Sequence, residues 1–229
     1  FGAAATATCL SAAFASALAG LILTADSIAA ERREGTLGFL FLTDLTGFDV
    51  LAGKLVAASV GAATALLAVF PVMAIGMILG GVTGGEFWRH SLALVNLLWV
   101  SVTVGLLASV QARDSGRALF NGGLVLLILA VLLPIAAAMA RSRNLPPVLD
   151  WLWALGPVEA FDHADHGYFA TRPDRFWRAL LLSHGMGWAF LGVAAGRLPR
   201  AWQDQPAEPR PLPGGKRRQI ERLHDGQNP

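Results

Sequence analysis

The stretch LVAASVGAATALLAVFPVMAIGMILGGVTGG, residues 55–85, decides the fold because it carries no charged side chain over its whole length. A helix needs about 20 apolar residues to cross about 30 Å of hydrocarbon. Four further uncharged windows occupy residues 1–25, 91–112, 118–140 and 179–196, and the last, which contains His184, is the shortest. We therefore predict an all-α fold, a polytopic membrane helix bundle with five spans.

The composition of the whole chain points the same way. Of its 229 residues, 54% are apolar and 15% are charged, whereas soluble domains carry about 25% charged residues. The net charge of +2 gives no reason to expect nucleic acid as a partner. A single cysteine, Cys9, cannot form an intrachain disulfide.

The windows suggest a division of the chain into two parts. We expect spans at about residues 2–27, 55–80, 91–112, 119–140 and 178–196, in a transmembrane domain over residues 1–196, followed by a polar, basic tail over residues 197–229. Small residues in the first span predict burial among other helices. Pro71 and Pro134 predict kinks, for which a static bend is favoured over a gating hinge. Because the first window begins beside Phe1, we expect a further span upstream.

Basic residues predict the orientation, since Lys and Arg are enriched on the cytoplasmic side of membrane proteins. If the first span starts outside, the cytoplasmic segments hold 12 basic residues and the outer segments hold 6. Without the tail these counts become 5 and 6. The prediction that the tail is cytoplasmic therefore depends largely on the tail itself.

The connection AAERREGTLGFLFLTDLTGFDVLAGK, residues 29–54, interrupts the apolar pattern. Charges at residues 31–34 end the membrane-buried part of the first helix, because a charge in the bilayer is costly. Gly35 is a natural helix stop, and Thr36 can cap a short helix that follows. The spacing of Thr46 and Asp49 fits a capping pattern at the start of the second span.

The short helix after Thr36 has apolar side chains around most of its surface, at residues 37 and 39–42. A helix that lies on a membrane needs one apolar face, and a larger apolar surface usually marks an interaction site. Two alternatives follow with equal weight. One face meets a soluble partner, or the helix is a connector buried beneath its own bundle.

Residues in this connection carry a resemblance to a known family. They are Glu31, Arg32, Gly35, Thr36, Leu37, Leu40, Leu42, Thr43, Leu45, Gly53 and Lys54. The pattern resembles the signature of permease subunits of type-2 ABC transporters. Asp44 stands where that family often has proline, and Thr46-Gly47 where it often has Ser-Pro.

The resemblance implies six spans in each permease unit and a coupling helix over residues 36–43. That helix would dock into a separate ABC-type ATP-binding subunit. The contact would be made by residues of the helix and of the segment before it, namely Glu31, Arg32, Gly35, Thr36, Leu37, Phe39, Leu40, Phe41, Leu42 and Thr43. Thr46, Asp49, Gly53 and Lys54 would form the helix start at the membrane interface.

The same resemblance implies the wider setting. The chain would be a multi-pass subunit of an exporter in the inner cell membrane, in contact with lipids and with a second permease half, identical or different. ATP and Mg²⁺ would be bound by the partner, because the only Gly-Gly-Lys here, residues 214–216, lacks the rest of a phosphate-binding loop. We assign no catalytic residue, cofactor or metal ligand to the chain.

Other polar groups suggest alternatives. The sequence FDHADHG brings together Asp162, His163, Asp165 and His166, which are residue types that bind metals. A hydrated loop is favoured over a metal-dependent membrane enzyme that uses these residues. A third alternative is a membrane assembly protein that transports nothing.

His184 is expected to be a packing residue. The sequence RDSGR, residues 113–117, is expected to be a solvated loop in preference to a second partner contact.

Overall fold

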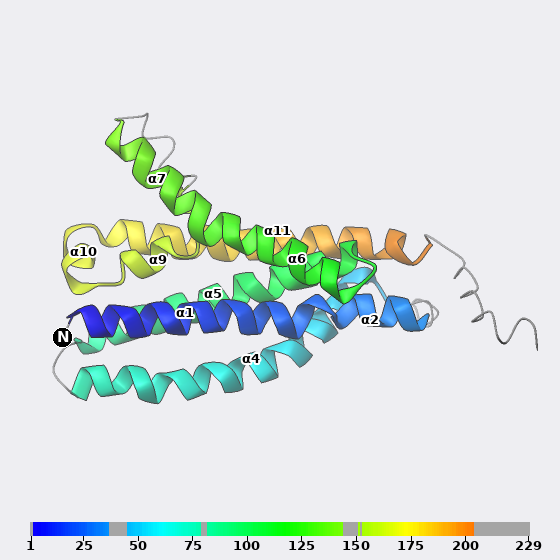
Figure 1. Ribbon diagram of the computed structural model, residues 1–229, viewed down its shortest axis with the longest axis horizontal. Helices are drawn as coiled ribbons and strands as arrows, with labels where there is room; N and C mark the ends of the chain where they lie inside the picture. Colours follow the sequence, from blue (N-terminus) through cyan, green and yellow to red (C-terminus); the bar gives the residue numbers. More distant parts are fainter. Residues whose placement is uncertain (1, 37–44, 79–81, 144–150, 152, 204–229) are drawn as a thin grey trace, which may run out of the picture.

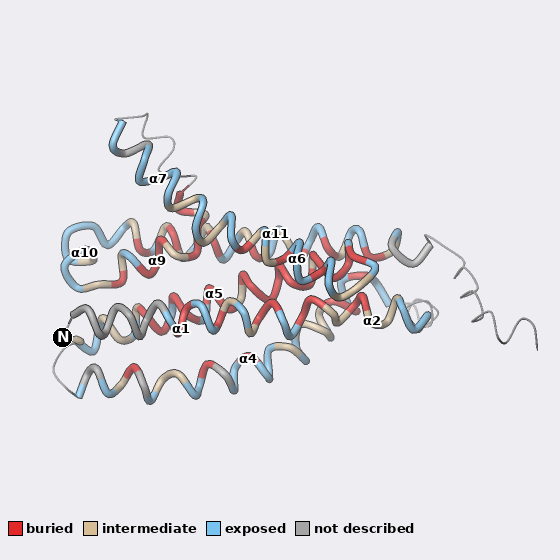
Figure 2. Tube along the Cα trace, viewed as in Figure 1, coloured by how far each residue is buried: buried red, intermediate tan, exposed pale blue. Residues whose placement is uncertain are grey.

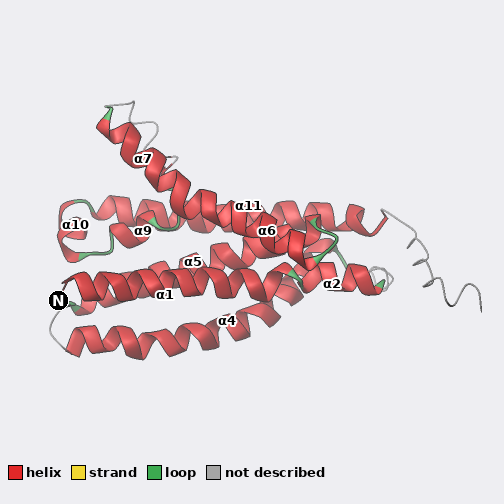
Figure 3. Cartoon of the chain, viewed as in Figure 1, coloured by secondary structure: helices red, strands yellow, loops and turns green. Residues whose placement is uncertain are grey.

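A computed structural model of the chain describes residues 2–36, 45–78, 82–143, 151 and 153–203. Within these ranges the chain is helical and contains no strand (Figure 3). The helices are α1 (Gly2–Ala25), α2 (Ser27–Glu34), α4 (Gly47–Ile78), α5 (Gly84–Gln111), α6 (Ser115–Leu127), η1 (Ile128–Leu132), α7 (Leu133–Ser142), α9 (Glu159–Asp162), α10 (His166–Thr171) and α11 (Pro173–Gln203).

Five helical stretches are long and apolar enough to cross a membrane. They are Ser11–Glu34, Gly47–Ile75, Gly84–Gln111, Ser115–Ala136 and Pro173–Arg200. The predicted all-α polytopic bundle with five spans is therefore confirmed. The long helices lie alongside one another and run the length of the molecule (Figure 1). Several helices extend beyond the uncharged windows: α4 begins at Gly47, so Asp49 and Lys54 lie in its first two turns.

The central helix of the bundle is α5, most of which is buried between α1 and α11 (Figure 2). Its contact with α1 depends on small residues: a Cβ atom added at Gly105 would lie 2.0 Å from Oγ1 of Thr24. Residues Ala12, Ala13 and Ser16 of α1 are buried as well. In lipid, close approach of backbones is a main source of helix association. The small residues of the first span therefore lie buried among other helices, as the sequence predicts.

The other spanning helices are more exposed. Only small shares of the most apolar windows of α4 and α6 are buried, and their exposed faces carry large apolar side chains that include Val60, Leu67 and Phe120. In water such faces would be unfavourable, but hydrocarbon solvates them. These faces are suited to contact with lipid or with another membrane helix.

Pro134 lies just after a π-helical turn. The N–H of Leu133 donates to the carbonyl of Ile128, five residues earlier, where an α-helix would use the residue four earlier. Proline lacks an N–H, and its ring clashes with the carbonyl four residues back, so the wider turn accommodates it. After this turn α7 leaves the direction of the bundle (Figure 1). In contrast, α4 continues through Pro71 as one helix.

Candidate functional site

The strongest polar network lies at one end of the bundle, where α2, the turn between α5 and α6, and the start of α4 meet. We call this the α2 end. The C-terminal end of α11 lies at the same end of the molecule (Figure 1). The opposite end holds the start of α5, α9 and α10. The part of the connection between α2 and α4, residues 35–46, starts and finishes at the α2 end and includes residues 36–43, which the sequence predicts as the coupling helix.

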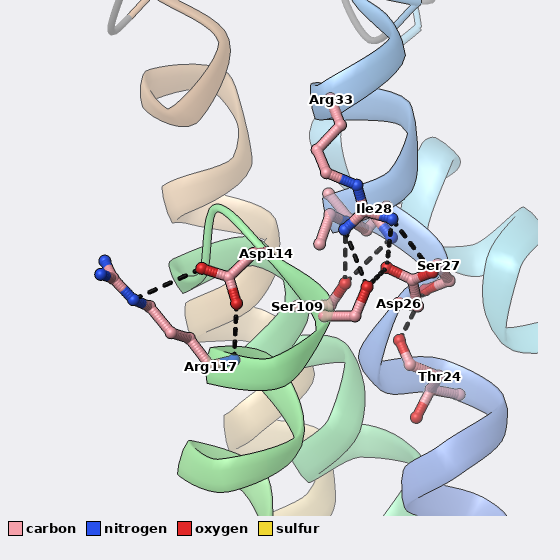
Figure 4. A network of polar contacts seen from close by, with 10 residues as sticks. Thr24, Asp26, Ser27, Ile28, Arg33, Ser109, Asp114 and Arg117 are labelled. Carbon is pink, nitrogen blue, oxygen red and sulfur yellow. Dashed lines mark hydrogen bonds and ion pairs between the residues drawn. The ribbon is translucent and has the colours of Figure 1, made fainter.

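Asp26 separates α1 from α2, and the start of α2 is capped from outside. The N-cap residue of a helix usually accepts one of its free N–H groups, but the Asp26 side chain makes no such bond here. Instead Oγ of Ser109, on α5, accepts bonds of 3.0 Å from the backbone N–H groups of both Ile28 and Ala29. Ser109 is fully buried. This hydroxyl therefore fixes α2 to the central helix (Figure 4).

The carboxylate of Asp26 connects α2 to α6. Ser115, the first residue of α6, donates a bond of 2.5 Å to Oδ1 of Asp26. Arg33 donates to both carboxylate oxygens, at 2.9 and 3.2 Å, and to Oγ of Ser115 at 2.8 Å. Bonds between charged groups are stronger than neutral ones. Three side chains from the α1–α2 junction, α2 and α6 thus form a closed set (Figure 4).

The turn between α5 and α6 holds the RDSGR sequence. Asp114 caps α6 by accepting the N–H of Arg117 at 2.9 Å, while Arg113 and Arg117 are exposed. The side chains drawn in Figure 4 place this turn beside α2. The turn is solvated at its two arginines and fixed to α2 at Ser115, a combination that the sequence did not reveal.

Gly35 ends α2 in the left-handed conformation, with φ of 74°, and its N–H donates to the carbonyl of Glu31. This is the helix stop that the sequence predicts, because glycine adopts this conformation without a steric penalty. The N–H of Thr36 also donates to the Glu31 carbonyl, at 3.0 Å. The chain therefore leaves α2 in a defined direction.

The start of α4, on the other side of the connection, is also fixed by local contacts. Thr46 and Asp49 form the predicted cap: the Thr46 hydroxyl donates to Asp49 at 2.6 Å, and the Asp49 N–H donates to that hydroxyl at 3.3 Å. Gly47 lies against α11, since a Cβ atom added there would be 2.6 Å from the carbonyl oxygen of Ala195. The first turn of α4 is thereby held against α11.

An ion pair joins the two sides. Nζ of Lys54, on α4, contacts Oε1 of Glu31, on α2, and both side chains are mostly buried. The other carboxylate oxygen of Glu31 is buried and has no hydrogen-bond partner among the described residues. Because part of each side chain is exposed, such a pair contributes about 1 kcal/mol. Glu31 and Lys54 therefore hold the start and finish of the connection together.

The sequence-predicted contact residues fall into two groups. Glu31 and Arg32 are half-buried on α2, Thr36 is exposed, and Gly53 lies in an open position on α4. The remaining contact residues lie outside the described part of the chain, as does Asp44. They are Leu37, Phe39, Leu40, Phe41, Leu42 and Thr43.

Sequence reasoning missed Asp26, Ser109 and Ser115. One signal was available, because Asp26 is the charge that ends the first uncharged window. The two serines gave none, since serine is common in membrane helices and bonds within its own helix. Their partners are 80 to 89 residues away in the chain.

The histidines and Asp165 that the sequence analysis singled out lie in different surroundings. His163 contacts the carbonyl of Glu159 through Nδ1 at 3.0 Å, and His166 is exposed at the start of α10. His184 is exposed on α11, with Nδ1 3.3 Å from Oδ1 of Asn96 and its ring stacked on Trp99. Asp165 instead faces His90 of α5, with 3.6 Å between Oδ1 and Nε2.

The five apolar helices define the class of the molecule, a multi-pass α-helical membrane protein. A family model described as "ABC-2 family transporter protein" matches residues 2–194. The chain belongs to this family and is thus a permease subunit of an ABC transporter, a transport subunit that spans the membrane. None of the curated proteins compared with it matches the chain.

Proposed function

We propose that the chain forms the membrane-spanning part of an ATP-driven exporter, and that residues 36–43 transmit movement from a separate ATP-binding subunit. The observation that carries this proposal is that both ends of the connection are fixed to the bundle. On one side α2 is held by Ser109 and Ser115, and on the other α4 is held against α11 and paired through Lys54.

Such fixed ends suit the transmission of force. A push on residues 36–43 would pass through α2 to the central helix at Ser109 and to α6 at Ser115. Packed helices that share buried polar bonds move as units, because interiors are dense and resist compression. Closure of two ATP-binding subunits would then tilt the α2 ends of two permease halves and change which side of the membrane the pathway faces.

The partners and the location follow from this mechanism. Each permease half needs an ATP-binding subunit that provides the ATP and Mg²⁺ sites, and a second half, identical or different, completes the pathway. We place the complex in the inner cell membrane, with the α2 end and the tail of residues 197–229 on the cytoplasmic side. The support for this orientation comes from the basic tail, because without it the two sides hold 5 and 6 basic residues.

The docking surface is tested by changing Leu40 and Phe41 together to Asp. The chain would be expressed with a candidate ATP-binding subunit, and the complex isolated through a tag on that subunit. Two charges in an apolar contact are expected to remove the association. Gln111→Asp is the matched control, because Gln111 is exposed at the same end of the bundle and lies outside the connection. Retention of the complex by the double variant contradicts the docking assignment.

The direction of transport has its own test. Inside-out membrane vesicles that contain the complex would be incubated with ATP and a total lipid and metabolite extract of the source cells. Mass spectrometry would then identify compounds that accumulate in an ATP-dependent way. An exporter accumulates its substrate in inside-out vesicles, and an importer does so only in right-side-out vesicles that contain ATP.

A further inference from the structure

A group of three metal-binding residue types lies at the end of the bundle opposite α2. Glu86 and His90 are four residues apart on α5, and Asp165 lies between α9 and α10. One nitrogen of His90 and one carboxylate oxygen from each acid all lie within 4.8 Å of one another. We propose that Glu86, His90 and Asp165 bind a zinc ion.

His90 is set up as a metal ligand by its surroundings. Its Nδ1 lies 3.0 Å from the carbonyl oxygen of Glu86, so this nitrogen carries the proton and donates. The lone pair is then on Nε2, as in zinc sites where the second ring nitrogen bonds to a carbonyl. The side chain is only 9% exposed, and Nε2 makes no hydrogen bond to any described residue.

The distances around Nε2 fit a shared ion better than a direct bond. Nε2 and Oδ1 of Asp165 are 3.6 Å apart, which is beyond a normal hydrogen bond. Two ligands that are each about 2.0–2.2 Å from one tetrahedral zinc ion lie about 3.3–3.6 Å apart. An ion between the two atoms would therefore contact both without movement of the backbone.

Glu86 supplies the third ligand while keeping its role in the helix start. Its Oε2 accepts the N–H of Thr83 at the long distance of 3.4 Å, as part of a capping box. A carboxylate has two oxygens and several lone pairs, so it can accept this bond and also bind an ion. The i, i+4 spacing places Glu86 and His90 on one face of α5.

The charge balance also favours a cation. Two carboxylates meet here, and the neighbouring Arg89 is directed elsewhere. Its Nε donates to the carbonyl of Ala164 at 2.7 Å, and its guanidinium lies over the ring of Phe169. Arg89 makes no ion pair with Glu86 or Asp165 within the described residues. A divalent cation would balance the two acids and leave a fourth coordination position for water.

Such an ion would join α5 to the segment between α9 and α11. It would stabilise the end of the bundle opposite the proposed partner contact. The argument depends on His90 and the two acids, and it does not depend on the proposed coupling to ATP hydrolysis.

Zinc binding can be measured on the purified full chain without any partner. Tag-free protein would be stripped with a chelator and titrated with zinc against a fluorescent zinc indicator. We expect one zinc per chain. Glu86→Gln, His90→Gln and Asp165→Asn should each weaken binding by at least ten-fold. His163→Gln is the matched control. Nδ1 of His163 contacts the carbonyl oxygen of the residue four positions earlier, as Nδ1 of His90 does, and His163 lies outside the cluster.

A second measurement covers the case in which His90→Gln does not fold. Zinc should raise the thermal unfolding temperature of the wild type and of His163→Gln, because a ligand that binds only the folded state stabilises it. The rise should be smaller for Glu86→Gln and Asp165→Asn, and glutamine in place of Glu86 keeps the helix cap. The absence of saturable zinc binding by the wild type overturns the proposal and leaves a simple His90–Asp165 pair. Undiminished binding by the two acid variants overturns it too.

Discussion

Ser115 donates a hydrogen bond of 2.5 Å to Asp26, so the first residue of α6 is attached to the residue at which α1 becomes α2. The two residues are 89 positions apart in the chain. This bond and the bond from Arg33 of α2 to the same hydroxyl close the α2 end. Four predictions follow from this end of the molecule and from the packing behind it.

Replacing Asp26 with Asn should destabilise the bundle by about 1 kcal/mol, because Arg33 loses its ionic partner while Ser115 keeps an acceptor. The value is modest since the Asp26–Arg33 pair is about half exposed. Thermal unfolding in detergent would measure it. In a double-mutant cycle with Ser115→Ala, the two changes should be less than additive, since both remove members of one network. Arg113→Gln serves as a control at an exposed position, and full additivity would contradict the network.

Replacing Ser109 with Ala should cost about 1–3 kcal/mol, because two N–H groups of α2 lose their acceptor in a buried site. Hydrogen exchange by NMR or mass spectrometry should show faster exchange at Ile28 and Ala29. Ser59→Ala is the control: Ser59 is exposed and bonds only to the carbonyl of Val56 in its own helix. Unchanged exchange in α2 would show that Ser109 is not its cap.

Replacing Gly105 with Ala should destabilise the α1–α5 contact by about 1–3 kcal/mol, because the added methyl group overlaps Thr24. Thr24→Ala in the same chain should restore most of the loss by making room. The matched control is Gly192→Ala on α11, where the added methyl meets open space. There the change should be neutral or stabilising, since alanine favours helix. Thermal unfolding of the wild type and these three variants decides the comparison.

Exchanging the charges of Glu31 and Lys54 tests whether this pair organises the connection. Lys54→Glu alone should weaken binding of the ATP-binding subunit by about five-fold, corresponding to about 1 kcal/mol for an ion pair. Glu31→Lys combined with Lys54→Glu should recover much of the binding, because an ion pair re-forms in reverse. Titration of the partner against purified variants gives both affinities. If the double variant binds no better than the single one, the pair has no part in docking.

The spans were predictable because four of the uncharged runs are longer than a bilayer requires and the fifth, residues 179–196, is close to that length. The helix ends were predictable where local chemistry decides them, at Gly35 through its left-handed conformation and at Thr46 through its cap. The helix that starts at Gly47, next to the predicted cap at Thr46, begins before the uncharged window that starts at Leu55, because charge marks the limit of the hydrocarbon and helices continue beyond it.

The polar networks could not be predicted, because they join residues that only packing brings together. Ser109 meets the N–H groups of α2 across about 80 positions, and Asp165 meets His90 across 75. The sequence grouped Asp165 with its neighbours Asp162, His163 and His166. The structure pairs Asp165 with α5 instead. Neighbours on a short turn point in different directions, so closeness in sequence is a weak guide to a ligand set.

The π-helical turn of η1 has a consequence for the face that α7 presents. A π turn contains one residue more than the α turn it replaces, and each residue of a helix adds a rotation of about 100°. Every side chain after Leu132 is therefore turned by about that amount relative to a regular continuation of α6. Deleting one residue from Ile128–Leu132 would restore the α register and rotate Ile135 and Met139 to another side of α7. The presence of one residue in η1 therefore determines which face α7 presents to its surroundings.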